Sequence, residues 1–170
     1  MLNDNELLSR FVGDKYSSYY REKWFKGGYA NMDPKKGTNI YSFNLAGMLL
    51  GVFWLCYRKM YKVAFLMAIL IPLLDIIMMH VKGEVGYSGI GNLIYGMIWI
   101  FATGLLGNML YHHHSVKKIQ KIVADTADST FLEERLVNQG GTTWIGGIGV
   151  GALAVIAILL MYVMFAPSWY

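Results

Sequence analysis

Two long uncharged segments constrain this chain more than any other feature of its sequence. Ile90–Tyr111 and Trp144–Phe165 each run for 22 residues without an Asp, Glu, Lys or Arg. A helix rises about 1.5 Å per residue, so either segment is long enough to cross a bilayer core of about 30 Å. We therefore expect both segments to be transmembrane helices.

A third apolar segment, Val63–Val81, is interrupted by Pro72 and Asp75 and is the third expected transmembrane helix. The composition agrees with a membrane location. Hydrophobic residues make up 55% of the chain and charged residues 15%, against about 25% charged residues in a soluble domain. The mean hydropathy of +0.38 argues against a disordered chain and against an ordinary soluble enzyme. The sequence predicts an all-α polytopic integral membrane protein with three transmembrane helices.

The uneven placement of basic residues predicts how the chain is threaded. Lys and Arg cluster in residues 58–62 and in the connection 112–143, whereas loop 82–89 has one lysine, offset by one glutamate. Because Lys and Arg are enriched on the cytoplasmic side of membrane proteins, residues 58–62 and 112–143 are expected in the cytoplasm. Loop 82–89 and the C-terminal segment 166–170 are expected outside.

The fourth apolar segment, Tyr41–Tyr57, starts with polar residues and is at the lower length limit for a span. Seven basic residues precede it, and a full span would place all of them outside. We therefore favour one short re-entrant or interfacial helix over a fourth span. The chain then divides into a cytoplasmic amphipathic N-terminal region, 1–40, and a membrane domain, 41–170. The segments of the membrane domain are 41–57, 63–81, 90–111 and 144–165.

Two amphipathic helices are expected on the cytoplasmic side. In residues 5–26, apolar and aromatic side chains recur at spacings near three and four, which is the periodicity of a helix with one apolar face. This helix either lies at the lipid headgroups or packs on the protein's own cytoplasmic face. Residues 115–137 have a similar pattern and end at a glycine stop, Gly140-Gly141.

Several motifs of the chain resemble the pattern of a known family. They are Phe11-Val12-Gly13, Tyr19-Tyr20, Lys23-Trp24, Ser42-Phe43-Asn44-Leu45-Ala46-Gly47, Phe53-Trp54-Leu55, Tyr57-Arg58-Lys59-Met60-Tyr61, Gly107-Asn108 with Tyr111, and Gly140-Gly141-Thr142. Spread over most of residues 10–145, they resemble a bacterial membrane-protein family known only as the domain of unknown function number twenty-six twenty-eight. Leu45 stands where that pattern usually has Trp. The resemblance implies a bacterial inner-membrane protein, and it implies no reaction.

Asp75 is the one acidic residue inside a predicted span. A carboxylate in hydrocarbon costs about 2.5–3.5 kcal/mol on insertion scales, so such a residue is usually protonated, paired or facing water. One interpretation is an ion or proton site. The other is a structural Asp that hydrogen-bonds a neighbouring helix, for example through Asn92, Thr103 or a Tyr hydroxyl.

Metal and cofactor sites are not expected. Cys56 is the single cysteine, which excludes an intramolecular disulfide and a paired-cysteine metal site. His112-His113-His114 are adjacent, whereas ligands on a helix usually need i, i+4 spacing to converge on one ion. Methionine is frequent, with 11 residues, but it is also an ordinary packing residue. No cofactor is predicted.

Small residues recur at helical spacing on three segments and predict close helix packing. They are Gly47, Gly51, Thr103, Gly107, Gly147, Gly151 and Ala154. Packing within one monomer is the favoured interpretation, and contact with a second copy or a partner is the alternative. None of these glycines stands in the polar strand-to-helix context of a phosphate-binding loop.

Basic and aromatic residues gather at the expected cytoplasmic interface, where they suit anionic headgroups and aromatic anchoring. The candidates for a lipid or partner interface are Arg21, Lys23, Trp24, Tyr57, Arg58, Lys59 and Tyr61. Simple topological anchoring is the favoured interpretation, and binding of a lipid or a partner segment is the alternative. Asn44 and Asn108 lie nearby, and capping of exposed helix ends is their expected role.

No catalytic motif is found, so an enzyme is not expected. The favoured function is a small non-catalytic subunit or accessory factor of a membrane complex, in contact with the lipid bilayer and with a second copy or another membrane protein. The alternative is an oligomeric channel or transporter component that uses Asp75. The net charge of +4 is explained by the threading, so no nucleic-acid partner is expected.

Overall fold

The computed structural model describes residues 2–25, 42–86, 90–126 and 128–165. For residues 82–86, 90–93, 95, 129, 130 and 165 it describes the backbone alone. Within these ranges all regular secondary structure is helical, as the sequence predicts. The start of the fourth apolar segment at Tyr41, the region 26–40 and the C-terminal segment 166–170 lie outside the described residues.

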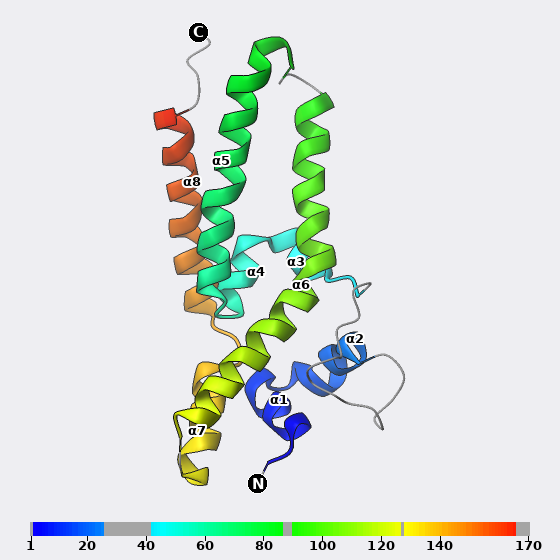
Figure 1. Ribbon diagram of the computed structural model, residues 1–170, viewed down its shortest axis with the longest axis vertical. Helices are drawn as coiled ribbons and strands as arrows, with labels where there is room; N and C mark the ends of the chain where they lie inside the picture. Colours follow the sequence, from blue (N-terminus) through cyan, green and yellow to red (C-terminus); the bar gives the residue numbers. More distant parts are fainter. Residues whose placement is uncertain (1, 26–41, 87–89, 127, 166–170) are drawn as a thin grey trace.

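Three long helices form the upper part of the molecule and run side by side along its long axis (Figure 1). They are α5 (Tyr61–Gly86), α6 (Ile90–Ala124) and α8 (Gly151–Phe165), which continues directly from a π-helical turn, η3 (Ile145–Val150). The chain rises along α5, returns along α6 and rises again along α8. Two stretches are long and apolar enough to cross a membrane, Tyr61–Val81 and Ile145–Met164.

Within the described residues, two of the three predicted spans are therefore long and apolar enough to cross a membrane. Ile90–Tyr111 is helical, as the first part of α6, but it is not among the two stretches. The side chains of residues 90–93 and 95 lie outside the described part of the chain, so the fully described part of this segment begins at Gly96.

The predicted helix 115–137 is wrong in its bounds. Helix α6 continues without a break through the histidines to Ala124, and a separate helix, α7, runs from Ser129 to Gln139. No Gly or Pro stands between Tyr111 and Ala124, so nothing interrupts the i to i−4 hydrogen bonds there. The break falls at residues 125–128, where two aspartates disfavour a helix interior.

The segment 41–57 forms two short helices instead of one. Helix α3 (Leu45–Leu50) and helix α4 (Val52–Tyr57) are separated at Gly51, whose φ of 48° is a conformation that favours glycine. Each six-residue helix is only about 9 Å long, too short to span a bilayer. They lie at the lower ends of α5 and α8 and beside the middle of α6 (Figure 1). The expected packing role of Gly51 is wrong, because a Cβ there would meet nothing within 4 Å.

The N-terminal region forms three helical pieces below this level: α1 (Asp4–Val12), a π-helical turn η1 (Tyr16–Tyr20) and α2 (Arg21–Trp24). A capping box starts α1: the Asn3 side chain accepts from the Glu6 backbone N–H, and the Glu6 carboxylate accepts from that of Asn3. The apolar stripe of this N-terminal region is buried against the rest of the protein. The buried members are Leu8, Phe11, Val12, Tyr16, Tyr20 and Trp24. Of the two interpretations of this region, the structure supports packing on the protein's own surface.

The glycines expected to allow close packing do so at α3 and α6. A Cβ on Gly47 would come within 3.2 Å of the Thr103 carbonyl oxygen, and one on Gly107 within 3.1 Å of the Asn44 amide nitrogen. Gly104 is tighter still, since its Cβ would lie 2.8 Å from the Phe43 ring. These distances are shorter than ordinary Cβ contacts, so α3 lies directly on α6.

A second close approach joins α4 to η3 and α8. A Cβ on Gly147 would lie 3.2 Å from Tyr57 Cβ, and one on Gly151 would lie 2.5 Å from the Phe53 ring. Ala154 is half-buried one turn further along α8. Both glycine contacts are within the monomer, as the favoured interpretation of the glycine pattern expects.

Candidate functional site

Arg58 is the central residue of the candidate site. It is 6% exposed, and its guanidinium carbon lies 4.7 Å from the ring centroid of Tyr20, 4.9 Å from that of Tyr111 and 5.8 Å from that of Tyr57. Its Nη1 donates to the Tyr111 hydroxyl over 3.5 Å. Ring faces attract cations through their quadrupole, so three tyrosines share the guanidinium charge.

The local sequence turns Arg58 inward. Helix α4 ends at Tyr57, and Lys59 then adopts a φ of 58°. The Met60 N–H bonds back to the Leu55 carbonyl over 2.8 Å, which closes the turn before α5 begins. The Lys59 ammonium donates to the Asn138 carbonyl over 2.8 Å, which ties this turn to the end of α7.

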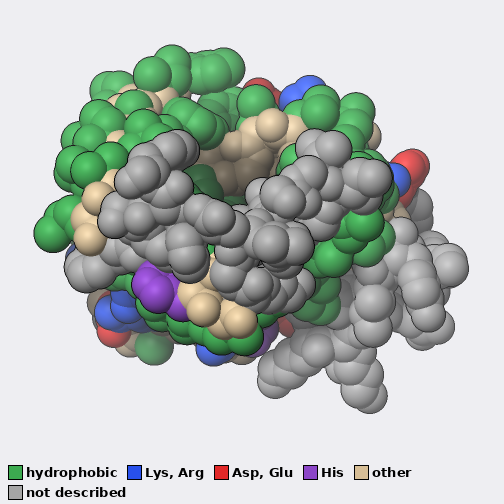
Figure 2. Space-filling model, turned by 90° about the horizontal axis from the view of Figure 1, so that it is seen from above, with side chains coloured by type: hydrophobic (Ala, Val, Ile, Leu, Met, Phe, Trp, Pro, Cys, Tyr) green, Lys and Arg blue, Asp and Glu red, His purple; other side chains and the backbone are tan. Residues whose placement is uncertain are grey.

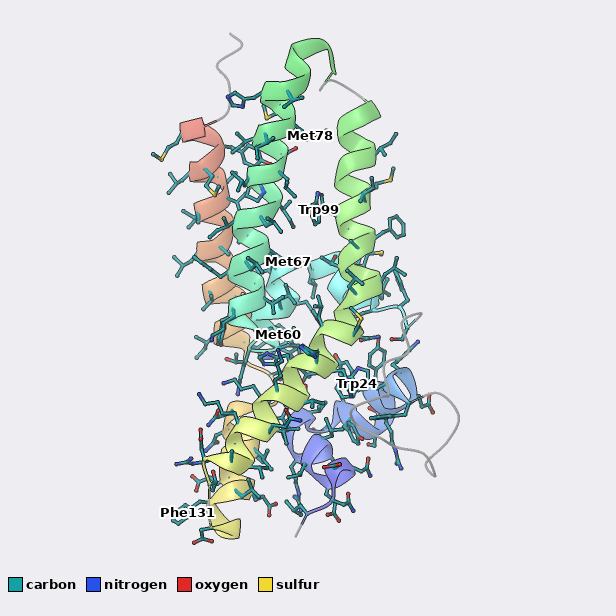
Figure 3. The ribbon with its side chains drawn as sticks, in the orientation of Figure 1. Trp24, Met60, Met67, Met78, Trp99 and Phe131 are labelled. Carbon is teal, nitrogen blue, oxygen red and sulfur yellow. The ribbon has the colours of Figure 1, made fainter. Side chains whose placement is uncertain are left out.

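Trp24 fastens the N-terminal region to α6 beside this arginine. It is 1% exposed, and its indole N–H donates to the Asn108 carbonyl over 2.9 Å. Its ring contacts those of Tyr16, Tyr20 and Tyr111 at centroid distances of 6.2, 4.9 and 5.6 Å. Figure 3 places Trp24 against the lower part of α6. The expectation that Trp24 belongs to a lipid or partner interface is therefore wrong, because its aromatic neighbours cover it.

Two buried asparagines connect α3 to α6 above the aromatic cluster. Asn44 caps α3 as expected, with its side-chain oxygen accepting from the Gly47 N–H over 2.9 Å. Asn108 does not cap a helix end. Its amide nitrogen lies 3.4 Å from the carbonyl oxygens of both Ser42 and Phe43, so it holds the chain that leads into α3.

A cavity of about 750 Å³ opens beside Arg58. Segments that are far apart in sequence line it: Lys15 and η1, then α3 and α4, then Trp144 and η3. One part of its wall is polar, with Lys15, Asn44 and Arg58. Another part is apolar and exposed, and its members are Leu45 at 56%, Leu50 at 55%, Trp144 at 72% and Ile148 at 65%. The cavity is thus amphipathic.

The electrostatics of the cavity are positive. Arg58 Nε has no hydrogen-bond partner, and no carboxylate forms an ion pair with Arg58 among the described residues. Burial raises the pKa of Tyr20, so this phenol stays protonated at neutral pH and supplies no negative charge. The site can therefore hold an anion against a cation and an apolar group against the exposed part of its wall.

The three histidines lie next to one another on α6. His112 is 5% exposed and packs edge-on against the rings of Trp24 and Phe25 at 5.0 and 5.8 Å, while His113 is exposed. Among the described residues no group of three His, Cys, Asp or Glu side chains could hold a metal ion. Burial, with a smaller contribution from His113, lowers the pKa of His112 to about 4.

Mild acid is expected to destabilise the protein through His112. In the unfolded chain its pKa is about 6.5, so protons bind the unfolded state preferentially; stability is full above that pH and falls between pH 6.5 and 4. At pH 5 the expected loss is about 2 kcal/mol from this group. Thermal unfolding of the purified protein in detergent at pH 7.5 and pH 5 measures it. H112Q should shrink the difference, whereas H113Q at the exposed neighbour should not; an equal acid loss in all three proteins contradicts the assignment.

Asp75 lies far along α5 from this cavity and contacts α8. The Tyr162 hydroxyl donates to its Oδ2, whereas its buried Oδ1 has no hydrogen-bond partner among the described residues. Trp99 extends from α6 toward α5 in the same upper part of the molecule (Figure 3). Of the partners proposed for Asp75, a Tyr hydroxyl is the one observed; the side chain of Asn92 lies outside the described residues.

Only some of the remaining predicted interface residues line the cavity. Tyr57 and Arg58 line it, whereas Tyr61 is 41% exposed at the start of α5. Lys23 places its ammonium 5.9 Å from the Tyr19 ring, and Arg21 is half-buried on α2. The run 57–61 therefore separates into cavity wall, turn and helix start.

Sequence reasoning missed the cavity residues contributed by other segments. Lys15, Tyr20, Trp54 and Trp144 were not among the candidates, although Tyr20 belongs to the aromatic stripe of residues 5–26. The one available signal was the unusual number of aromatic residues, 15% of the chain. These residues come together because the chain turns at Gly51 and at Lys59. Hydrophobic periodicity does not predict such turns.

Comparison with known proteins gives one match. A family model described as a protein of unknown function, DUF2628, matches residues 14–117. The matched range includes Arg58, the three tyrosines around it and Trp24. No curated protein and no solved structure matches the chain significantly.

Proposed function

The chain belongs to the DUF2628 family of proteins of unknown function, and from its geometry we propose that it is a small, non-catalytic integral membrane protein that acts as a subunit or accessory factor of a membrane complex. The proposal rests on the separation of apolar from basic residues along the long axis of the molecule. Exposed apolar side chains cover α5 and α8. The Lys and Arg residues whose side chains are described belong to the N-terminal region, the turn that leads into α5 and the start of that helix, the last part of α6, and α7, which make up the lower part of the molecule (Figure 1).

The exposure of α5 and α8 supports a membrane location. Only 22% of the apolar window of Tyr61–Val81 and 11% of that of Ile145–Met164 is buried inside the protein. Phe65 is 69% exposed and Val163 82%. Seen along the long axis, hydrophobic side chains cover most of the described surface, and charged ones appear at its edge (Figure 2). A soluble protein rarely exposes an apolar surface of this extent, whereas lipid would cover it.

The course of the chain supports a single threading. Residues 58–62 and the connection between α6 and α8 lie at the basic end, and the end of α5 and the start of α6 lie at the opposite end (Figure 1). We therefore propose that Ile90–Tyr111 is the third span, that α3 and α4 lie at the interface, and that the N-terminus is cytoplasmic and the C-terminus outside. The family resemblance favours the bacterial inner membrane.

The cytoplasmic part then forms a helical platform, by which we mean α1, η1, α2 and α7. Arg10 on α1 pairs with Glu133 on α7 at 2.8 Å, and the Gly141 N–H donates to the Phe11 carbonyl over 2.6 Å. Phe131, at 58% exposed, points away from the molecule at the lower end (Figure 3). An exposed aromatic side chain on a part of the protein that lies in water favours a contact with a partner protein or a second copy.

Site-specific photo-cross-linking in cells tests this role. A photoreactive amino acid at position 131 is expected to give one discrete protein adduct, whose mass distinguishes a second copy from another membrane protein. The same amino acid at position 65 on α5, which we place in lipid, is the matched control and is expected to give no protein adduct. Absence of any protein adduct from position 131, in cells that express the protein at its natural level, would overturn the accessory role.

A channel or transporter component is the second candidate, because Asp75 Oδ1 is buried without a hydrogen-bond partner among the described residues. This function requires that ion flux through liposomes containing the purified protein depends on Asp75. We expect no such flux, and we expect D75N, which can still accept from Tyr162, to keep the assembly and to change stability by about 1 kcal/mol or less. Flux in the wild type that D75N abolishes would favour the channel over the accessory role.

A further inference from the structure

The cavity beside Arg58 has two chemically different parts, and their arrangement matches the shape of an amphiphile. Lys15 and Arg58 supply two cationic groups from segments that are 43 residues apart. The apolar part of the wall, at Leu45, Leu50 and Ile148, is exposed and continuous with the apolar surface of α3 and η3. An occupant with its head at Arg58 can therefore extend an apolar chain outward without leaving apolar surroundings.

Arg58 itself indicates the charge of the group that this cavity would bind. Taking a guanidinium out of water is costly unless the charge is paired and its N–H groups are hydrogen-bonded. Here the side chain is 6% exposed, its Nε has no hydrogen-bond partner among the described residues, and its hydrogen bond to the Tyr111 hydroxyl is long at 3.5 Å. The tyrosine faces compensate only part of this cost. An anionic oxygen at Nε would satisfy both the charge and the free N–H.

The volume limits the size of the occupant. A cavity of about 750 Å³ falls within the range of about 300–1,000 Å³ that is usual for small-molecule sites. It can enclose a compact anionic headgroup and the first part of a chain, while the rest of the chain lies along the exposed apolar surface. The rings of Tyr57 and Trp144, whose centroids are 5.0 Å apart, pack against each other in the wall of this cavity.

We propose that this cavity binds an anionic phospholipid, with the phosphate against Arg58 and Lys15 and the acyl chain over Leu45, Leu50 and Ile148. The proposal deepens the proposed function, because it rests on placing α3 and α4 at the membrane interface, and it names the ligand of that level of the molecule. A bound lipid of this kind would couple the membrane to the platform through Tyr20 on η1. It would also give the Arg58 guanidinium an anionic partner in every protein molecule that binds the lipid.

Native mass spectrometry of the full-length protein, delipidated in detergent and then titrated with phosphatidylglycerol or phosphatidylcholine, tests the proposal. The wild type is expected to retain one phosphatidylglycerol and to bind it at least 10-fold more tightly than phosphatidylcholine. R58Q is expected to weaken phosphatidylglycerol binding by about 10- to 100-fold, the effect of losing a charged hydrogen bond. K117Q, which removes an exposed cation of α6 outside the cavity wall, is expected to bind as the wild type does.

A second pair of variants tests the cavity without removing the buried charge. Ala46 lines the cavity and is exposed, so A46W should fill the space and block the lipid while the melting temperature stays within a few degrees. Ala152 is an exposed alanine of α8 outside the cavity wall, and A152W is the matched control that should bind normally. This pair decides the outcome if R58Q fails to fold.

Three results would overturn the proposal. They are equal affinity for the anionic and the neutral lipid, unchanged binding in A46W, and binding of inorganic phosphate with no retention of phosphatidylglycerol, which would indicate a soluble anion as the ligand. The titration is independent of the cross-linking at position 131. A protein that binds the lipid but gives no adduct retains this inference and loses the accessory role, and the reverse result does the opposite.

Discussion

Replacing Trp24 by alanine is expected to destabilise the protein by about 3–5 kcal/mol, the usual cost of emptying a buried aromatic site. The loss has three physical parts: the buried ring surface, the contacts with Tyr20 and Tyr111, and the hydrogen bond to the Asn108 carbonyl. Because Trp24 joins the N-terminal region to α6, the variant should also release that region. Denaturant unfolding in detergent measures the first effect, and the rate of proteolysis within residues 2–25 measures the second.

Two further substitutions sharpen this test. W24F keeps most of the ring surface and loses the hydrogen bond, so we expect an intermediate cost of about 1–2 kcal/mol. W144A removes a tryptophan that is 72% exposed and should change stability by less than about 1 kcal/mol. If W24A and W144A cost the same, Trp24 does not hold the N-terminal region, and the buried cluster described here is wrong.

Replacing Gly140 by valine is expected to separate α1 from the end of α7, at a cost of about 3 kcal/mol or more. A Cβ on Gly140 would lie 2.0 Å from the Phe11 carbonyl oxygen and 2.8 Å from that of Leu136. Both neighbours are backbone atoms, so no side-chain rotation can relieve the clash. The variant should therefore also lose the hydrogen bond from the Gly141 N–H to the Phe11 carbonyl.

Unfolding in detergent measures this cost, and a spin-label pair at positions 10 and 133 reports the separation of α1 from α7. The matched control is G149A, because a Cβ on Gly149 would meet nothing within 4 Å and alanine is the better helix former. We expect G149A to leave stability unchanged or slightly raised. A G140V protein with the wild-type distance distribution would contradict the contact between these helices.

Periodicity and charge predicted the parts of the fold that depend on single segments. The apolar lengths at α5 and α8 and the glycine contacts of Gly47, Gly107 and Gly151 follow from the composition of one helix or from spacing along it. The bounds of α6 did not follow, because the step from the apolar segment to the histidines changes polarity without interrupting the backbone hydrogen bonds. A change in polarity was mistaken there for the end of a helix.

The sequence predicted only part of the candidate site, and the reason differs from that for α6. The run from Tyr57 to Tyr61 identified Arg58, but its burial depends on the tyrosines of η1 and α6 and on the positive φ of Lys59. Such a turn has no strong sequence signal when the residue is a lysine, because lysine rarely adopts this conformation. Trp24 was wrongly predicted to lie at an interface for a similar reason. An aromatic residue beside cations in the sequence fits an interface and a protein core equally well until its neighbours in space are known.

The central claim is that the basic end of the molecule, with the N-terminal region and α7, faces the cytoplasm while the long helices cross the membrane. Cys56 is buried, so cysteines placed at exposed Ser17 and at Ser168 can be labelled in turn with a membrane-impermeant maleimide on intact spheroplasts. We expect labelling at position 168 without permeabilisation and at position 17 only after it. Labelling at position 17 on intact spheroplasts would contradict the account, since it would place the N-terminal region and its seven basic residues outside.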